Sequence, residues 1–295
     1  MTTATVSNEE FLATVAEKSD GAALRGDYSQ ADARYVVQQH WDAYTEAEHA
    51  LWRKLYQRQA ALLPGRACQE FIDALEKMDA AHGIPDFTQT SDALFKATGW
   101  TIVAVPGLIP ELTFFEHLAN RRFPVTVWLR TPEEFNYIVE PDVFHDYFGH
   151  VPMLFNPVFA DYMQLYGKGG LKAMSLGGLD YLARLYWYTV EFGLINTPEG
   201  LRIYGAGILS SAGEVEYCLS RGTHSHHLRL DIERCLRTLY KIDTYQETYF
   251  VIDDFQQLFD GTAPDFTPVY ERLKQLPSLP ANSLLAHETE LLEAL

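Results

Sequence analysis

Apolar residues recur at intervals of three and four along several parts of the chain, which is the spacing that places them on one face of a helix. The clearest such stretch is 179–195, which two glycines precede and an Asn-Thr-Pro sequence follows. Its apolar stripe consists of Leu179, Leu182, Ala183, Tyr186 and Val190. The same pattern predicts helices over 31–63, 69–81 and 111–120.

Short runs rich in β-branched residues predict a few strands, at 100–105, 124–129, 202–204 and 249–252. Helices outnumber these strands, and the order of the elements fits neither an alternating β–α–β series nor an all-β protein. The pattern therefore predicts a mainly α fold with a few short strands, an α+β protein.

The ends of the chain differ from its middle. Residues 1–30 are small, polar and acidic with weak periodicity, which predicts a loosely ordered N-terminal lead-in. From residue 262 the chain is rich in proline and loop residues, and it finishes in an acidic, helix-like stretch. We therefore expect one domain at 31–275 and a C-terminal tail at 276–295.

Composition narrows the class of protein. The 295 residues are 47% hydrophobic and 21% charged, and 40 acidic against 23 basic residues give a net charge of −17. This negative charge argues against binding to nucleic acid or to an anionic membrane surface. No apolar run approaches the roughly 20 residues that a bilayer requires, and no basic segment precedes an apolar core as in a signal peptide. We expect a cytoplasmic protein with neither nucleic-acid nor membrane partners.

Most residues that could bind a metal have simpler interpretations. Cys68, Cys218 and Cys235 lack CxxC spacing, so we expect reduced, partly buried thiols. The tract from His224 to His227 has no carboxylate at ligand spacing and is interpreted as a polar loop. Isolated histidines are interpreted as surface or structural residues: His40, His49, His82, His117 and His287.

His145 and His150 are different, because they lie five residues apart in the otherwise aromatic and apolar stretch 141–152. Burying two neutral imidazoles without partners is costly, and a metal ion would satisfy both. Five residues of an α-helix turn through about 140°. The two rings therefore converge only if one lies at a helix end or if the turn is widened locally, which Gly149 would permit.

The spacing also separates this stretch from the zinc proteases. Their HExxH motif places two histidines four apart with a glutamate after the first. Here the histidines are five apart and the residue after His145 is Asp146. The sequence therefore disfavours a metallopeptidase.

Glu191 is a candidate third ligand, because it is a lone acid among aromatic and aliphatic neighbours at 186–194. A carboxylate in such surroundings needs a cation or a shifted pKa, and an ion pair with Arg184 is the alternative to a metal. Two histidines and one carboxylate form the facial triad of non-haem Fe(II) oxygenases, which leaves coordination positions open. Trp187 lies one turn before Glu191 and could form the wall of an aromatic pocket.

These segments resemble the pterin-dependent aromatic amino acid hydroxylases, and most closely the bacterial phenylalanine 4-monooxygenases. The resemblance covers about residues 35–270. The matching segments are 57–59, 63–68, 105–110, 115–121, 141–152, 185–194 and 204–211. It implies a mainly helical, basket-like catalytic domain with a small sheet. It also implies hydroxylation of L-phenylalanine to L-tyrosine with O2, Fe(II) and a tetrahydropterin, either tetrahydrobiopterin or a related pterin.

The resemblance further implies roles for matching positions. It makes His145, His150 and Glu191 the catalytic iron ligands. The implied pterin-binding residues are Gly107, Leu108, Ile109, Phe114 and Asp146. The implied substrate-binding residues are Arg130, Tyr137, Pro141, Asp142, Trp187, Gly207 and Ser210. Among these, Phe114 would stack on the pterin, and Asp142 would orient Arg130 for a bidentate contact with the substrate carboxylate.

The chain departs from the animal members of this family. About 100 residues precede Pro106, too few for their regulatory domain, and no sustained heptad pattern follows residue 270. We therefore expect a monomer without allosteric activation by phenylalanine. Ile138 replaces a threonine that lies beside the substrate backbone in the animal enzymes.

The choice among aromatic amino acids remains open in the sequence. Ile242 aligns with a position that is acidic in tyrosine hydroxylases, which favours a ring without a hydroxyl group. A hydroxylase of tryptophan or another ring, a zinc hydrolase with the same ligands and a non-catalytic amino-acid-binding protein are the alternatives.

Overall fold

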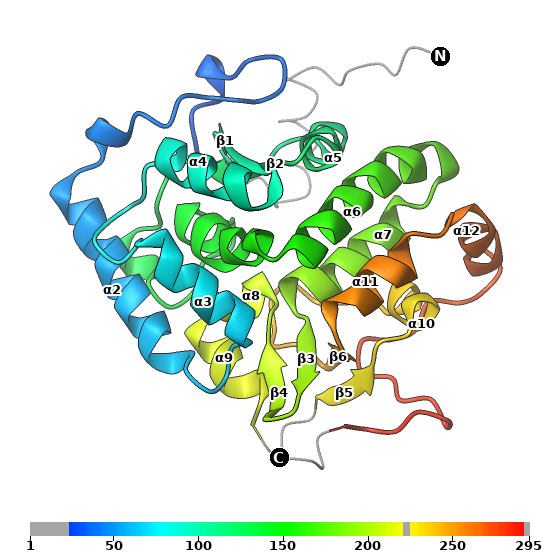
Figure 1. The fold of residues 1–295 in the computed structure, drawn as a ribbon. Coiled ribbons are helices and arrows are strands. Elements are labelled where there is room, and N and C mark those ends of the chain that lie inside the picture. Colours follow the sequence, from blue (N-terminus) through cyan, green and yellow to red (C-terminus); the bar gives the residue numbers. More distant parts are fainter. Residues whose placement is uncertain (1–23, 221–224, 292–295) are drawn as a thin grey trace.

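The computed structural model describes residues 24–220 and 225–291, and helices dominate them (Figure 1). The α-helices are α2 (Glu46–Leu62), α3 (Gln69–Met78), α4 (Phe87–Thr98), α5 (Glu111–Ala119), α6 (Pro157–Leu176), α7 (Leu179–Tyr186), α8 (Ala206–Leu209), α9 (Ala212–Cys218), α10 (Ile232–Arg237), α11 (Phe255–Thr262) and α12 (Thr267–Leu273). Two segments are π-helices, η4 (Phe144–His150) and η6 (Trp187–Glu191). Short 3-10 helices are η1 (Tyr28–Gln30), η2 (Trp41–Ala43), η3 (Pro132–Glu134) and η5 (Val151–Phe155).

Two small sheets complete the fold. One is a parallel pair, β1 (Thr101–Val105) with β2 (Arg122–Thr126). The other has the order β4-β3-β6-β5, formed by β3 (Leu194–Thr197), β4 (Gly200–Ile203), β5 (His226–Arg229) and β6 (Thr248–Ile252). In this sheet β4 runs antiparallel to β3, while β6 runs parallel to both β3 and β5. The two sheets lie at opposite ends of the view in Figure 1, with α6 between them.

The mainly helical fold with a few short strands is confirmed. The helix expected at 111–120 is α5, and the strands expected at 100–105 and 249–252 are β1 and β6. Within the described residues, none of the helices is long and apolar enough to cross a bilayer. All three cysteines are free and buried.

The helix expected at 31–63 is wrong in its first half, because α2 begins only at Glu46. Thr45 and Glu48 form a capping box there, in which each side chain accepts the backbone N–H of the other residue. Before it, Tyr35 and His40 have left-handed backbones, with φ of 59° and 49°. Such residues interrupt a right-handed helix, and this stretch is instead irregular apart from a turn and the short 3-10 helix η2.

The helix expected at 179–195 is also wrong at its end. It changes to a π-helix at Trp187 and stops at Glu191, and Ile195 lies on β3, opposite Ile252 of β6. Pairing with the sheet therefore overrides the helical pattern of the last residues.

The hydrophobic pattern of the sequence did not predict α4 or α6. Glycines on α6 obscure its apolar face because they lie where α5 packs against it. A Cβ at Gly167 would fall 2.4 Å from the backbone nitrogen of Ala119, and one at Gly170 would fall 2.0 Å from the ring of Phe115. At these two positions close packing against α5 takes the place of large apolar side chains.

Both ends of the described chain are packed against the domain. The lead-in expected at 1–30 lies outside the described residues up to residue 23, but residues 24–30 are not loose, because Tyr28 is buried. The helix-like tail is wrong as well, because the described residues after α12 form no helix longer than a turn. They instead pair with the domain, as in the bridge between Thr238 and Leu279 and the hydrogen bond from Leu291 N to the His227 carbonyl.

Candidate metal centre and active site

The π-helix η4 brings His145 and His150 together. Backbone hydrogen bonds of a π-helix join residues five apart, so residues at that spacing lie about one turn apart on the same side. The two Nε2 atoms are 3.2 Å apart and the ring centroids 5.0 Å apart. Gly149 allows η4 to approach α8, because a Cβ there would lie 2.8 Å from the Ala206 carbonyl oxygen. The five-residue spacing allowed two geometries, a ligand at a helix end or a widened turn. The fold adopts the widened turn.

Glu191, at the end of the second π-helix, completes the cluster. Its Oε1 lies 3.2 Å from His150 Nε2, and its Oε2 lies 3.6 Å from His145 Nε2. Arg184, the alternative partner, instead donates to the Leu236 carbonyl. Within the described ranges, this is the one cluster of three or more histidine, cysteine or acidic side chains that could hold a metal ion.

The geometry of the three ligand atoms fits a first-row metal. Bonds of about 2.1 Å at right angles place neighbouring ligand atoms about 3 Å apart, close to the separations found here. His145 Nδ1 lies 3.0 Å from Ser210 Oγ, a hydrogen bond that leaves Nε2 directed at the cluster. The backbone N–H of Gly207 bonds to the Glu191 carboxylate, and a Cβ at Gly207 would lie 3.1 Å from Oε2.

The surroundings shift the pKa values of Glu191 and His145 toward the forms that bind a metal. Burial alone would raise the pKa of Glu191, but His150 and His145 outweigh that effect and lower it. Burial lowers the pKa of His145, which favours the neutral imidazole. Burial acts in the same direction on His150, although the Glu191 carboxylate raises its pKa on balance. The carboxylate and the neutral imidazole are the forms that ligate metals.

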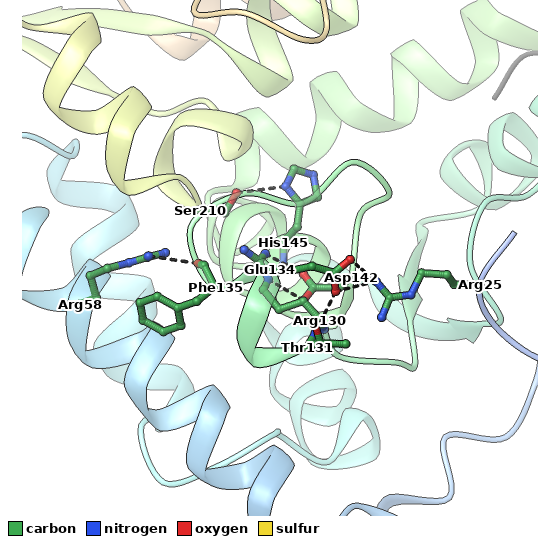
Figure 2. Close-up of polar contacts among 9 residues, drawn as sticks. All are labelled: Arg25, Arg58, Arg130, Thr131, Glu134, Phe135, Asp142, His145 and Ser210. Carbon is green, nitrogen blue, oxygen red and sulfur yellow. Dashed lines mark hydrogen bonds and ion pairs between the residues drawn. The ribbon is translucent and has the colours of Figure 1, made fainter. Parts of the chain in front are cut away.

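Arg130 and Asp142 form a buried ion pair beside the cluster (Figure 2). Arg130 donates Nε and Nη2 to the two Asp142 oxygens at 2.8 and 2.9 Å, and its backbone N–H donates to the same carboxylate. Asp142 also accepts the His145 backbone N–H at 3.0 Å. Both side-chain bonds use one edge of the guanidinium, so its other edge is left for another anion.

The segment 107–109 connects β1 to α5. A Cβ at Gly107 would lie 2.9 Å from the Tyr28 hydroxyl and 3.0 Å from Glu140 Oε1, so these groups approach the backbone closely. The Tyr28 hydroxyl donates to the Leu108 carbonyl at 2.8 Å, while the Leu108 side chain is exposed. Tyr28 therefore holds the backbone of this segment on the side that packs against the protein, while the Leu108 side chain points to solvent.

Aromatic rings link α5 to the metal cluster. Phe114 packs edge-on against Tyr186 with ring centroids 5.8 Å apart, and Tyr186 lies 6.2 Å from the His150 ring at an interplanar angle of 29°. Asp146, next to the first ligand, accepts the Thr126 backbone N–H at 2.8 Å, and burial raises its pKa. A flat ring placed against Phe114 would thus lie on the same side of the fold as the cluster.

The remaining candidates lie around the cluster or on a nearby loop. Trp187 begins η6, and Gly207 and Ser210 lie on and directly after α8. Pro141 is partly buried, whereas Tyr137 is exposed on the loop that precedes Asp142. The structure therefore places Ser210 and Gly207 against the three candidate metal ligands and leaves Tyr137 at the surface.

Residues near the N-terminus were not identified from the sequence. The Arg25 guanidinium donates Nη1 to both Glu134 oxygens at 2.7 and 2.8 Å (Figure 2). It also lies 4.2 Å from the centroid of the Trp128 ring. These contacts fasten the first described residues to the loop that follows Arg130. No signal in the sequence could have revealed them, because the partners lie about a hundred residues apart and follow no local pattern.

The second histidine tract has structural partners. His226 and His227 lie on β5 rather than in the expected polar loop, and His224 lies outside the described residues. His226 pairs with Glu290 at 2.8 Å, and the buried His227 Nε2 bonds to the Cys218 carbonyl at 2.6 Å. The first contact attaches the C-terminal segment to the sheet, and the second attaches β5 to the end of α9.

Comparisons with known proteins agree with this geometry. The chain is 57% identical over 271 residues to a phenylalanine-4-hydroxylase of Ralstonia nicotianae, covering 92% of this chain and 84% of the relative. It is 61% identical over 240 residues to that of Chromobacterium violaceum, covering 81% and 80%. A crystal structure of C. violaceum phenylalanine hydroxylase with bound oxidised Fe(III) superposes with a TM-score of 0.86 at 57% identity, covering 88% of this chain and 95% of that one. A cobalt-bound structure of the same enzyme matches equally well, with a TM-score of 0.86.

A family profile covers most of the domain. The profile described as biopterin-dependent aromatic amino acid hydroxylase matches residues 27–270, which include every residue of the cluster and of the segments around it. Together with the relatives and the converging ligand atoms, this match shows that the chain belongs to the biopterin-dependent aromatic amino acid hydroxylase family.

Proposed function

We propose that this protein is a phenylalanine 4-monooxygenase, which hydroxylates L-phenylalanine to L-tyrosine with O2 and a tetrahydropterin at a non-haem Fe(II) centre. The observation that carries the proposal is the convergence of His145, His150 and Glu191 in one facial set. The names of the bacterial relatives supply the substrate.

The iron and the pterin, when bound, supply the activation of O2 for which no amino-acid side chain is suited. His145 and His150 would hold the iron through Nε2, and Glu191 would hold it through its carboxylate. Ser210 holds the His145 ring in the required orientation. Three protein ligands leave half of an octahedral sphere for small molecules.

The pterin site is assigned to the open face between Phe114 and the 107–109 segment. Phe114 provides a ring for stacking, and the backbone of Gly107, Leu108 and Ile109 provides hydrogen-bonding groups for the edge of a flat heterocycle. Asp146, held by the Thr126 N–H, lies at the boundary between this face and the metal cluster. Its carboxyl group is placed to accept or donate a proton there.

Arg130 is assigned to the carboxylate of the amino acid substrate. Asp142 fixes the guanidinium by two bonds along one edge, so the substrate meets a group with one orientation. Trp187, Pro141 and Gly207 line the space for the aromatic ring, with Tyr137 at its entrance. Because these walls are largely apolar, bound substrate excludes water from the reacting atoms.

The direct test is product formation by the iron-loaded protein. Fe(II)-reconstituted protein with phenylalanine, O2 and tetrahydropterin is expected to form tyrosine at about one mole per mole of pterin oxidised. Stoichiometric iron without tyrosine would reject the proposal. Activity restored by zinc without O2 would favour a hydrolase, and phenylalanine affinity that is unchanged in metal-free protein would favour a binding protein.

Selectivity among the aromatic amino acids is part of the proposal. Ile242 offers no polar partner for a ring hydroxyl, although its side chain is 70% exposed. Values of kcat/KM for phenylalanine, tryptophan and tyrosine, measured together, are expected to be highest for phenylalanine. A higher value for tryptophan would assign another substrate to the same site.

We also propose a cytoplasmic, monomeric protein whose catalytic unit extends through 31–275, preceded by the packed residues 24–30. Three buried cysteines without a disulfide support a reducing compartment. Light scattering on the purified protein tests the oligomeric state, and a mass of about twice the chain would reject the monomer.

A further inference from the structure

Phe192 lies between Trp187 and the metal cluster and links the two. A Cβ at Gly207 would lie 3.1 Å from Glu191 Oε2 and 3.0 Å from the ring of Phe192, so that ring adjoins the cluster. The Phe192 and Trp187 ring centroids are 4.7 Å apart. The indole therefore forms the next section of an aromatic wall that begins at the Glu191 carboxylate.

The loop formed by residues 239–246, between α10 and β6, holds the indole in place. Tyr240 stacks on Trp187 with ring centroids 4.3 Å apart and an interplanar angle of 14°. The indole Nε1 donates to Gln246 Oε1 at 2.8 Å. The stack fixes one face of the ring, and the hydrogen bond fixes its rotation within that plane.

Gln246 uses the rest of its amide to shape the same loop. Its Nε2 donates to the carbonyls of Lys241 and Thr244 at 3.2 and 3.3 Å. Its backbone N–H donates to Glu214 Oε1 at 3.3 Å, and the same oxygen accepts the Tyr249 hydroxyl at 2.5 Å. Gln246 is only 4% exposed, and its bond to Glu214 is buried, so leaving these polar groups without partners would be costly.

The outer part of the loop contrasts with this anchored inner part. Ile242 is 70% exposed and Tyr245 is 51% exposed, so neither side chain is packed into the core. Tyr240 and Gln246 connect the loop to Trp187, while Tyr245 stacks on Tyr217 and the Leu239 carbonyl accepts the Tyr188 hydroxyl elsewhere on the loop. Because one amide binds both the loop carbonyls and the indole, movement of either is transmitted to the other.

We propose that Gln246 is a positioning residue that determines substrate selectivity: its amide locks the 239–246 loop to the Trp187 indole and so fixes the wall of the ring pocket. The proposal rests on the proposed function, because it assigns the pocket to an aromatic amino acid. Gln246 itself contacts neither metal ligand nor substrate and acts through Trp187.

Gln246→Met tests this directly, because methionine has a similar length but can neither accept from the indole nor donate to the carbonyls. We expect KM for phenylalanine to rise about tenfold and the ratio of kcat/KM for phenylalanine over tryptophan to fall about tenfold. Iron content and KM for the tetrahydropterin are expected to stay at the wild-type values. A general loss of structure would change all four quantities.

Two further variants separate positioning from stability. Trp187→Phe removes the indole N–H while leaving the Gln246 amide bonded to the loop, and it should lower the selectivity ratio in the same direction. The selectivity ratio of the double variant should then equal that of the single variant with the lower ratio. The reason is that both substitutions remove the same hydrogen bond, from the Trp187 indole to Gln246. Gln257→Met is the matched control, since the Gln257 amide on α11 also accepts an N–H, here the backbone N–H of Asp253, and donates to a carbonyl, that of Leu230. It should leave the ratio unchanged.

A selectivity ratio that stays at the wild-type value in Gln246→Met, with only Tm lowered, would overturn the proposal. If the wild-type protein hydroxylates no aromatic amino acid, the proposed function fails instead. Calorimetric Kd values for phenylalanine still decide the positioning role in that case: a Kd equal in wild type and Gln246→Met rejects it, and a weaker Kd in the variant supports it.

Discussion

Asp142 accepts hydrogen bonds from both the guanidinium of Arg130 and the backbone N–H of His145. One buried carboxylate therefore fixes the residue assigned to the substrate carboxylate and the first turn of the helix that carries both imidazole ligands. A shift of Asp142 would therefore change the orientation of both Arg130 and the helix that carries the histidines. Substrate and metal positions are coupled in this way.

Asp142→Asn should damage binding and folding together. The variant leaves the Arg130 cation buried without its counter-ion, which costs about 3–5 kcal/mol of unfolding free energy. KM for phenylalanine should rise more than KM for the pterin. Denaturant unfolding and steady-state kinetics measure these effects. Asp253→Asn is the control, because its pair with Arg229 is solvent-exposed and should contribute about 1 kcal/mol or less.

Ser210→Ala should weaken iron binding. The variant removes the hydrogen-bond partner of His145 Nδ1, and loss of such an outer partner typically costs about 10- to 100-fold in metal affinity. Competition with a chelator measures the Fe(II) Kd. The exposed Ser175, which bonds only to the Lys172 carbonyl in its own helix, gives the control Ser175→Ala. Equal iron affinity in all three proteins would contradict the assigned role of Ser210.

Tyr28→Phe should affect the pterin more than the amino acid. The variant removes the bond to the Leu108 carbonyl and leaves the ring in place, so the 107–109 segment gains freedom. We expect KM for the tetrahydropterin to rise several-fold, equivalent to about 1 kcal/mol, with KM for phenylalanine nearly unchanged. Tyr181→Phe, on α7, is the control. A rise confined to KM for phenylalanine would place the pterin elsewhere.

Buried His117 should make the fold sensitive to acid. Its Nε2 bonds to the Arg34 carbonyl and its Nδ1 accepts Arg122 Nε, and burial lowers its pKa below the ordinary value. As the pH falls through about 6.5, His117 is therefore protonated in the unfolded chain before it is protonated in the folded protein. The free energy of unfolding then decreases below that pH. Denaturant unfolding at several pH values measures the loss. The slope should be smaller in His117→Gln, and identical slopes would contradict the assignment.

The metal candidates could be predicted because each is a polar residue in apolar surroundings. His145, His150 and Glu191 stand out locally, and their burial has few inexpensive explanations. The distortion that joins them could be anticipated as well, since a spacing of five does not fit an α-helix. The fold class followed from periodicity in the same way.

Other features depend on contacts between distant parts of the chain. The bond from Trp187 to Gln246 spans 59 residues, and the bond from Tyr28 to Leu108 spans 80. Neither residue type is unusual at its own position. Helix α6 was missed for a related reason, because Gly167 and Gly170 fit against α5 and interrupt an apolar stripe that otherwise includes Phe159, Met163 and Tyr166. Such pairings become visible only when the fold brings the partners together.

The central claim is that two imidazoles and one carboxylate bind a single iron. Crystals of the Fe(II)-loaded protein, measured with anomalous scattering at the iron edge, test it most directly. The account predicts one iron at about 2.0–2.2 Å from Nε2 of His145, Nε2 of His150 and a carboxylate oxygen of Glu191, with its other positions open to solvent. An iron bound at any other group of residues, or bound without Glu191, would contradict it.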